Sequence, residues 1–155
     1  AEIGNPELGF VGEVTKVNVD LIRASLDNGF IPMIAPLGVH VRDGSENAGS
    51  ALNINGDTVA GELAHALQAE QLVFLTDVAG VMDGGGRVIR RLDRRRANIL
   101  FNSGVIQGGM IPKLETCLHA VANGVGAAHI LDGRLPHVLL LEAFTAAGVG
   151  TMIEA

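Results

Sequence analysis

Short apolar runs alternate with stretches of helical periodicity along most of the chain. Apolar runs bounded by glycine or proline are typical of strands, whereas apolar residues at spacings of three and four indicate a helix face. The pattern predicts an extended hairpin arm at Gly9–Val19 and strands at Ile31–Leu37, Val39–Arg42, Leu72–Thr76, Ala128–Leu131 and Thr151–Ile153. It predicts helices at Val19–Asn28, Asp57–Gln68, Asp93–Asn102, from just after Gly109 to Gly124, and at Pro136–Ala147, the last ended by Gly148.

The order of these elements predicts one α/β domain over residues 1–155, built as a three-layer αβα sandwich around a mainly parallel sheet. Leu72–Thr76 is apolar almost throughout, as is typical of a strand covered by helices on both faces. We expect Val39–Arg42 to pair with the hairpin arm. Pro32 and Pro36 cannot donate hydrogen bonds, so Pro32 should lie at the start of its strand or on an unpaired side.

Composition narrows the class of protein. The 155 residues have a net charge of −6, with 48% apolar and 18% charged residues, which excludes intrinsic disorder. An acidic chain disfavours a general nucleic-acid-binding surface, so we interpret its basic cluster as a solvated helix face (Arg90, Arg91, Arg94, Arg95 and Arg96). No apolar run approaches the ~18 residues of a membrane span, and no signal peptide opens the chain. The single cysteine, Cys117, cannot form an internal disulfide, so we expect a protein of the reducing cytoplasm.

Many of the 21 glycines lie where a predicted strand gives way to a helix. At such places in α/β folds, missing side chains let backbone N–H groups approach a phosphate. Among these junctions, glycines are most concentrated in the loop Asp77–Gly86 and at the pair Gly108-Gly109. Neither a G-x-x-x-x-G-K-[ST] motif nor a complete G-x-G-x-x-G motif after a strand is present, which disfavours a P-loop NTPase and a dinucleotide dehydrogenase.

Lys113 follows the glycine pair in the first turn of a predicted helix. A cation there opposes the helix dipole. The side chain therefore either bends into solvent or faces an anion held between itself, the glycine N–H groups and the helix end. Position alone leaves both readings open.

Polar side chains crowd the start of the predicted helix Asp57–Gln68. Capping needs only one of Asn53, Asn55 and Asp57, so their number also indicates a polar site. In the loop after Leu72–Thr76, Asp77 and Asp83 are most simply explained as turn-forming residues.

Three motifs, in this order and spacing, resemble the amino-acid kinase family: NINGD at 53–57, LTDVAGVMD at 75–83 and GGMIPK at 108–113. GFVGEV at 9–14, HILDGR at 129–134 and GVGTMI at 148–153 extend the resemblance over nearly the whole chain. The branch that phosphorylates N-acetyl-L-glutamate is the most similar. The resemblance implies ATP-dependent phosphorylation of the side-chain carboxylate of that substrate in arginine biosynthesis, with Mg²⁺ accompanying ATP.

The resemblance also implies roles for individual residues. Lys113 would stabilise charge on the transferring phosphoryl group, which is what phosphoryl transfer chiefly requires of a protein. Asp57 would hold the catalytic lysines in place, and Asn53, with Asn55, would bind acetylglutamate. The nucleotide would lie against the segments 76–82 and 105–110, with Thr76, Asp77, Val78, Gly80, Val81, Met82, Gly108, Gly109 and Met110 as binding residues. Three further residues coincide with an arginine effector site of feedback-inhibited members: His129, Glu142 and Gly148.

The family has an N-terminal half that finds no counterpart here, with another glycine-rich loop, a second catalytic lysine and most of the acetylglutamate pocket. We therefore expect this chain to be a nucleotide-binding half that binds adenine nucleotide weakly and is inactive alone, and a homo-oligomer at full length. Alternatives stay open. They are another family member acting on aspartate, glutamate, carbamate or UMP, a non-catalytic nucleotide- or effector-binding regulatory module, and nucleic-acid binding through the arginine cluster.

Overall fold

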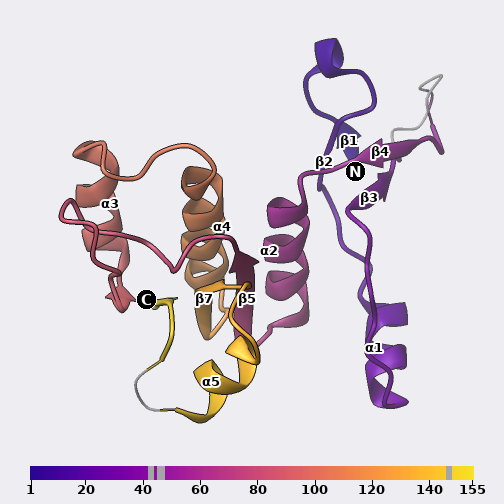
Figure 1. The fold of residues 1–155 in the computed structure, drawn as a ribbon. Helices are drawn as coiled ribbons and strands as arrows, with labels where there is room; N and C mark the ends of the chain where they lie inside the picture. Colours follow the sequence, from indigo (N-terminus) through magenta and orange to yellow (C-terminus); the bar gives the residue numbers. More distant parts are fainter. Residues whose placement is uncertain (42–43, 45–47, 146–147) are drawn as a thin grey trace. The chain divides into compact units, whose positions relative to one another are not determined.

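The computed structural model describes residues 1–41, 44, 48–145 and 148–155. Within these residues the chain divides into two compact units, Ala1–Leu67 and Gln68–Ala155, and each is described by itself (Figure 1). Arg42 and Ala147, which end two of the predicted elements, lie outside the described residues. That the whole chain is one nucleotide-binding domain stays a prediction.

The first unit contains short strands and two helices. In chain order these are β1 (Glu2–Ile3), the 3-10 helix η1 (Pro6–Leu8), β2 (Gly12–Glu13), α1 (Asp20–Asp27), β3 (Leu37–Val39), β4 (Ala51–Asn53) and α2 (Gly56–Leu67). β1 pairs antiparallel with β2, and β3 pairs antiparallel with β4. Of the extended hairpin arm predicted at Gly9–Val19, only β2 is a strand, and it pairs with β1.

Two strand predictions in this unit are wrong. Residues 31–36 form no strand, and β3 begins only at Leu37. Ile31 and Met33 are 90% and 97% exposed, and the neighbouring prolines cannot donate to a ladder. The run is therefore largely exposed within its unit, although the carbonyl of Pro36 accepts a hydrogen bond from the N–H of Ile54 (3.0 Å). The strand expected from Val39 ends at that residue and pairs with β4 rather than with the arm.

The helix predictions in the first unit are confirmed within a residue or two. The Oδ1 atom of Asn18 accepts a hydrogen bond from the N–H of Asp20 (3.1 Å) at the start of α1, and Gly29 follows the helix with a φ of +78°. The helix α2 ends at Leu67, one residue early, because Gln68 adopts a left-handed φ of +53°.

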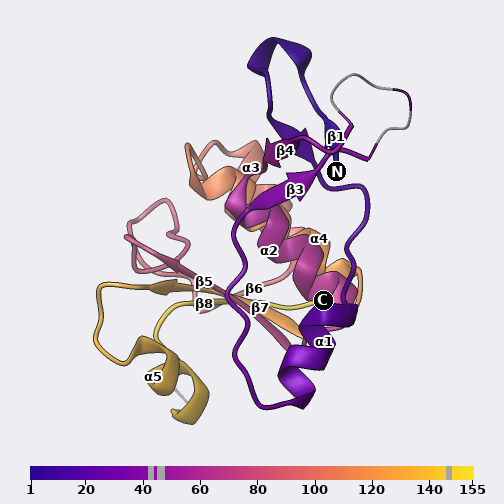
Figure 2. The same ribbon diagram turned by 90° about the vertical axis from the view of Figure 1, so that its right-hand side faces the viewer.

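The second unit is a mixed sheet with helices on both faces. Its elements are β5 (Gln71–Thr76), β6 (Arg91–Leu92), α3 (Arg94–Asn102), α4 (Met110–Ala122), β7 (Ala127–Asp132), α5 (Val138–Phe144) and β8 (Thr151–Ile153). The strand order is β5-β7-β8-β6, in which β5–β7 and β6–β8 are parallel and β7–β8 is antiparallel. Figure 2 shows α4 above this sheet and α5 below it. The predicted α/β class, with a mainly parallel sheet between helical layers, is confirmed.

The core of this unit lies between α4 and the sheet. The apolar stripe predicted for this helix is buried, as Leu114, Cys117, Leu118 and Val121 all lie inside. Ile130 and Ile153 of the sheet are also fully buried. Each such aliphatic side chain contributes roughly 1.5–3 kcal/mol by leaving water, which fixes α4 and the loop before it against the strands.

The last helix is shorter than the sequence predicts. His137 adopts a left-handed φ of +58°, so α5 cannot extend back to Pro136 and begins at Val138. Thr145 is extended, with φ −119° and ψ +137°, and its Oγ1 donates to the carbonyl of Leu141 (2.6 Å). The extended backbone of Thr145 therefore ends the helix before Gly148 is reached. β6 was not predicted, because two residues are too short to show a pattern.

Candidate functional site

A pocket of about 350 Å³ opens in the second unit. One wall consists of Val78, Gly80, Val81, Met82 and Asp83, and the other of Val105, Ile106, Gln107 and Met110. The first wall follows β5 and the second leads into α4. Concave, largely apolar sites of this size with a few polar groups are typical of small-molecule binding.

The structure brings together some of the predicted nucleotide-binding residues. Five of them line the pocket, namely Val78, Gly80, Val81, Met82 and Met110. Four lie next to these residues in the chain but outside the lining, namely Thr76 at the end of β5, Asp77, Gly108 and Gly109. The structure adds Asp83 and singles out Val105, Ile106 and Gln107 within the predicted segment 105–110. Motif matching could not separate these residues, because lining depends on which way each loop residue faces.

Asp83 shapes the turn that carries the first wall. Its Oδ1 accepts hydrogen bonds from the N–H groups of Gly85 (2.8 Å) and Arg87 (3.0 Å), and its Oδ2 pairs with the Nε of Arg87 (3.2 Å). The backbone N–H of Arg87 is the largest cause that lowers the pKa of Asp83 below its usual range. The turn-forming interpretation of Asp83 is thus confirmed.

Lys113 lies in the first turn of α4, as predicted, three residues after the pocket residue Met110. Its ammonium group is 5.8 Å from the centre of the Phe74 ring. Phe74 comes from β5 and is only 7% exposed. A cation over an aromatic face is attracted by the negative face of the ring. The Lys113 side chain, itself half-buried, thus packs back onto the sheet rather than only reaching into solvent.

Asn53, Asn55 and Asp57 belong to the first unit and have different local environments. The Oδ1 of Asn55 accepts hydrogen bonds from the N–H groups of Asp57 (2.9 Å) and Thr58 (3.2 Å), so Asn55 caps α2. Asn53 ends β4 with an exposed side chain. Asp57 is half-buried in the first turn of α2. The capping interpretation therefore accounts for one of the three residues.

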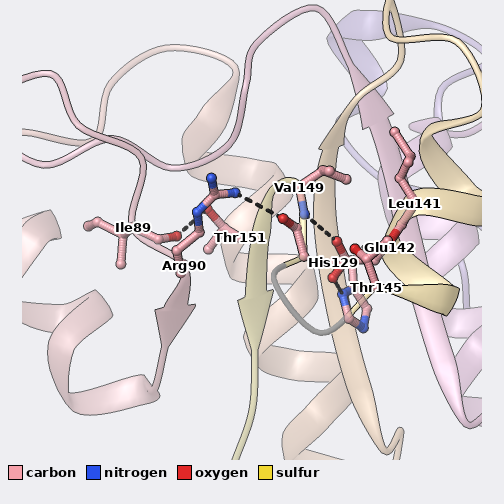
Figure 3. A network of polar contacts seen from close by, with 9 residues as sticks. Ile89, Arg90, His129, Leu141, Glu142, Thr145, Val149 and Thr151 are labelled. Atoms are coloured by element: carbon pink, nitrogen blue, oxygen red, sulfur yellow. Dashed lines mark hydrogen bonds and ion pairs between the residues drawn. The ribbon is translucent and has the colours of Figure 1, made fainter.

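His129, Glu142 and Gly148 come together on the second unit, where β7, α5 and the segment before β8 meet. Figure 3 shows His129 beside the side chain of Glu142. The Oε1 of Glu142 lies 2.9 Å from Nδ1 of His129, and its Oε2 accepts from the N–H of Val149 (2.7 Å). The side chains of His129 and Glu142 are 5% and 14% exposed. A Cβ at Gly148 would lie 3.3 Å from the Glu142 carboxylate. Glu142 is thus a nearly buried, paired carboxylate rather than a solvated one.

Asp132, the last residue of β7, and Arg134 form a bidentate ion pair. The Nε and Nη2 atoms of Arg134 each lie 2.8 Å from a carboxylate oxygen of Asp132, and the Arg134 N–H also donates to Oδ1 (3.0 Å). The side-chain hydrogen bonds of Arg134 lower the pKa of Asp132 to about 2, and the pair raises the pKa of Arg134. This pair fixes the chain where it leaves the sheet.

Within the described ranges, no group of three or more His, Cys, Asp or Glu side chains gathers as a metal ion would require. No helix in the described part of the chain combines the length and apolar character needed to cross a membrane.

The chain belongs to the amino acid kinase family, which residues 1–132 match. It is 48% identical over 153 residues to an acetylglutamate kinase of Nostoc, covering 97% of this chain and 50% of the relative. The chain therefore spans about half the length of the curated relatives it matches.

Solved structures agree on the fold. An N-acetylglutamate synthase from Neisseria gonorrhoeae, complexed with coenzyme A and L-arginine, superposes with a TM-score of 0.85 at 30% identity, over 95% of this chain and 33% of that protein. A Streptococcus mutans protein superposes with a TM-score of 0.79 at 34% identity, over all of this chain and 55% of that protein. The amino-acid kinase fold is shared with both.

Proposed function

We propose that this chain supplies the ATP-binding half of a kinase that phosphorylates the side-chain carboxylate of N-acetyl-L-glutamate in arginine biosynthesis. The observation that carries the proposal is the pocket of about 350 Å³ whose second wall leads into the helix bearing Lys113. The names of the relatives, acetylglutamate kinases about 48% identical to this chain, support the choice of acceptor.

In this proposal the two loops hold the nucleotide and Lys113 acts on the phosphates. The apolar pocket walls suit a base and ribose, and the start of α4 adds favourable partial charge for phosphate. Lys113 would stabilise negative charge on the transferring phosphoryl group. The acceptor carboxylate is itself the nucleophile, so no nucleophilic side chain is required. Mg²⁺ would enter with ATP, since it is held largely by nucleotide phosphates in kinases.

The first unit would contribute to the acceptor side. Asp57 would orient the catalytic lysines, and the asparagines would bind acetylglutamate. Of the two, Asn53 is the better candidate, because the Oδ1 of Asn55 already accepts two backbone hydrogen bonds. A cytoplasmic setting and a homo-oligomer of the longer protein belong to the same proposal and rest on the sequence resemblance.

Replacement of Lys113 by alanine tests the proposal in a protein that carries both halves, with Lys16→Ala as the matched control at an exposed lysine of the first unit. A kinase is expected to lose kcat by about 10²–10³, as when one donor to a developing charge is removed. Lys16→Ala should leave kcat unchanged. A loss of nucleotide affinity without a loss of kcat would instead favour a binding module. The 155-residue chain alone is expected to form no acetylglutamyl phosphate.

A second function, feedback control by L-arginine, is favoured by the cluster of His129, Glu142 and Gly148. Each carboxylate oxygen of Glu142 makes one contact and keeps a second lone pair. Because the neighbouring Gly148 has no side chain, these lone pairs could accept hydrogen bonds from a guanidinium or ammonium group. The Neisseria structure named above holds L-arginine, which supports the choice of ligand. Calorimetry of the longer protein with L-arginine should show binding that Glu142→Ala abolishes and Glu115→Ala, at an exposed glutamate of α4, preserves. Absence of heat and of inhibition would refute this function.

A further inference from the structure

Thr151 joins the two ends of the loop between Val81 and Ile89, and the Val81 end lines the pocket. This residue of β8 is fully buried. Its Oγ1 accepts a hydrogen bond from the N–H of Val81 (2.9 Å) and donates one to the carbonyl of Ile89 (2.7 Å). Figure 3 shows the contact with Ile89. One hydroxyl therefore satisfies both a donor and an acceptor that would otherwise be buried without partners.

The Val81 end of this loop is a wall of the pocket. The carbonyl of Val81 accepts from the N–H of Ile89 (2.8 Å), so both backbone groups of Val81 are held. Gly80, next along the wall, has a φ of +140°, and a Cβ there would lie only 2.7 Å from Oγ1 of Thr151. This pocket wall thus lies so close to Thr151 that a side chain at position 80 would push the wall away from Thr151.

The backbone of Thr151 pairs with Ile130 of β7, and the segment that leads into it is held by a further contact two residues earlier in the chain. The N–H of Val149 donates to Glu142, whose other oxygen contacts His129. Between these two points, Gly150 packs so tightly on the carbonyl of Ile130 that no side chain would fit. The segment 148–151 therefore has a carboxylate contact at one end and the pocket wall at the other.

We propose that Thr151 is a positioning residue for the nucleotide-binding wall, and that Glu142 helps to set the position of Thr151 through Val149. This inference rests on the proposed function, in which the pocket binds a nucleotide. Thr151 lies in the GVGTMI segment at 148–153, but the resemblance implies no role for it, because a buried threonine in a strand has no distinctive sequence signal. A merely structural Thr151 would affect the stability of the fold but not the affinity of a folded variant.

The hydroxyl is tested with Thr151→Val, which keeps the shape of the side chain, and with Thr151→Ser, which keeps the hydroxyl. We expect the Kd of MgATP, measured by amide chemical shifts in NMR, to rise about tenfold in T151V because two buried backbone groups lose their partner. T151S should stay within about twofold of the parent, since the hydrogen bonds persist. Hydrogen exchange of the Val81 amide, measured without ligand, should accelerate in T151V and not in T151S.

The link to Glu142 is tested with Glu142→Ala and the control Glu115→Ala. Hydrogen exchange of the Val81 and Val149 amides should accelerate in E142A but not in E115A. The Kd of MgATP should rise in E142A by less than it rises in T151V. A folded T151V with parental Kd and parental Val81 exchange would overturn the role of Thr151. If T151V does not fold, parental Val81 exchange in E142A would overturn the link. If the parent chain binds no MgATP, the proposed function fails, while Val81 exchange still decides whether Thr151 positions the wall.

Discussion

The ammonium group of Lys113 lies 5.8 Å from the centre of the Phe74 ring. The two residues come from different elements, α4 and β5, which are brought together by the packing of the helix on the sheet. The contact holds a cation near the N-terminal end of a helix, where the helix dipole alone would disfavour it. Phe74 therefore limits where the Lys113 charge can lie.

Replacing Phe74 by leucine should release this contact while keeping an apolar side chain in the core. The sequence has two lysines, Lys16 and Lys113, so selectively labelled lysine gives two NMR signals. The Lys113 side-chain protons should be shifted upfield by the ring current and move toward the Lys16 position in F74L. Identical Lys113 shifts in the parent and in F74L would show that the ammonium group does not lie over the ring.

The two asparagines of the first unit should differ in their effect on stability. Asn55→Ala removes the cap of α2 and should lower the free energy of unfolding of the first unit by about 1 kcal/mol. Asn53→Ala, at an exposed side chain, is the control and should cost little. Thermal unfolding followed by circular dichroism measures both. An equal loss in the two variants would contradict the capping role assigned to Asn55.

The ion pair of Asp132 and Arg134 should make stability depend on pH in the acid range. Arg134 holds the pKa of folded Asp132 at about 2, against an ordinary value of 3.8. The unfolded chain therefore binds more protons between these values, so the contribution is complete above about pH 4 and is lost as pH falls through about 2. Asp132→Asn removes this contribution.

Urea unfolding of the parent and of D132N at a series of pH values measures this effect. The parent should be the more stable near neutral pH, and the difference in free energy of unfolding should shrink as the solution is acidified. D132E, which keeps the charge but changes the reach of the carboxylate, is a useful comparison. A difference that stays constant down to about pH 2 would mean that Asp132 is not held ionised by Arg134.

Much of the second unit follows from local sequence patterns. β8 has the predicted bounds, β5 begins one residue earlier than predicted, and β7 is one residue longer than predicted at each end. Most of their apolar residues are buried within the unit, although Leu75 of β5 is 52% exposed, so pattern and environment largely agree. The run at 31–36 of the first unit is equally apolar, but most of it is exposed, and the carbonyl of Pro36 at its end accepts a hydrogen bond from the N–H of Ile54 without extending a strand into the run. An apolar pattern shows which residues a segment can bury. Whether the segment forms a strand depends on whether another part of the fold pairs with it and covers it.

The candidate site was predictable only as two segments. The glycine pair and Lys113 locate the start of α4 in the sequence, but the lining also includes Asp83 and Gln107, whose exposure to the pocket depends on loop geometry. Similarly, Asn55 could be assigned to the cap only once its Oδ1 was seen to accept two N–H groups. Long-range contacts such as Thr151 with Val81, 70 residues apart, leave no local trace.

Titration of the isotope-labelled chain with MgATP, followed by amide and lysine NMR signals, tests the nucleotide-binding proposal most directly. The largest shifts should fall on residues 78–83 and 105–110 and on the side chain of Lys113, with Lys16 unchanged. The affinity for MgATP should be weak but the binding specific, and the chain should neither hydrolyse ATP nor transfer its phosphate. No shifts at these residues, or shifts confined to the arginines at 90–96, would contradict the proposal and favour a nonspecific polyanion-binding surface.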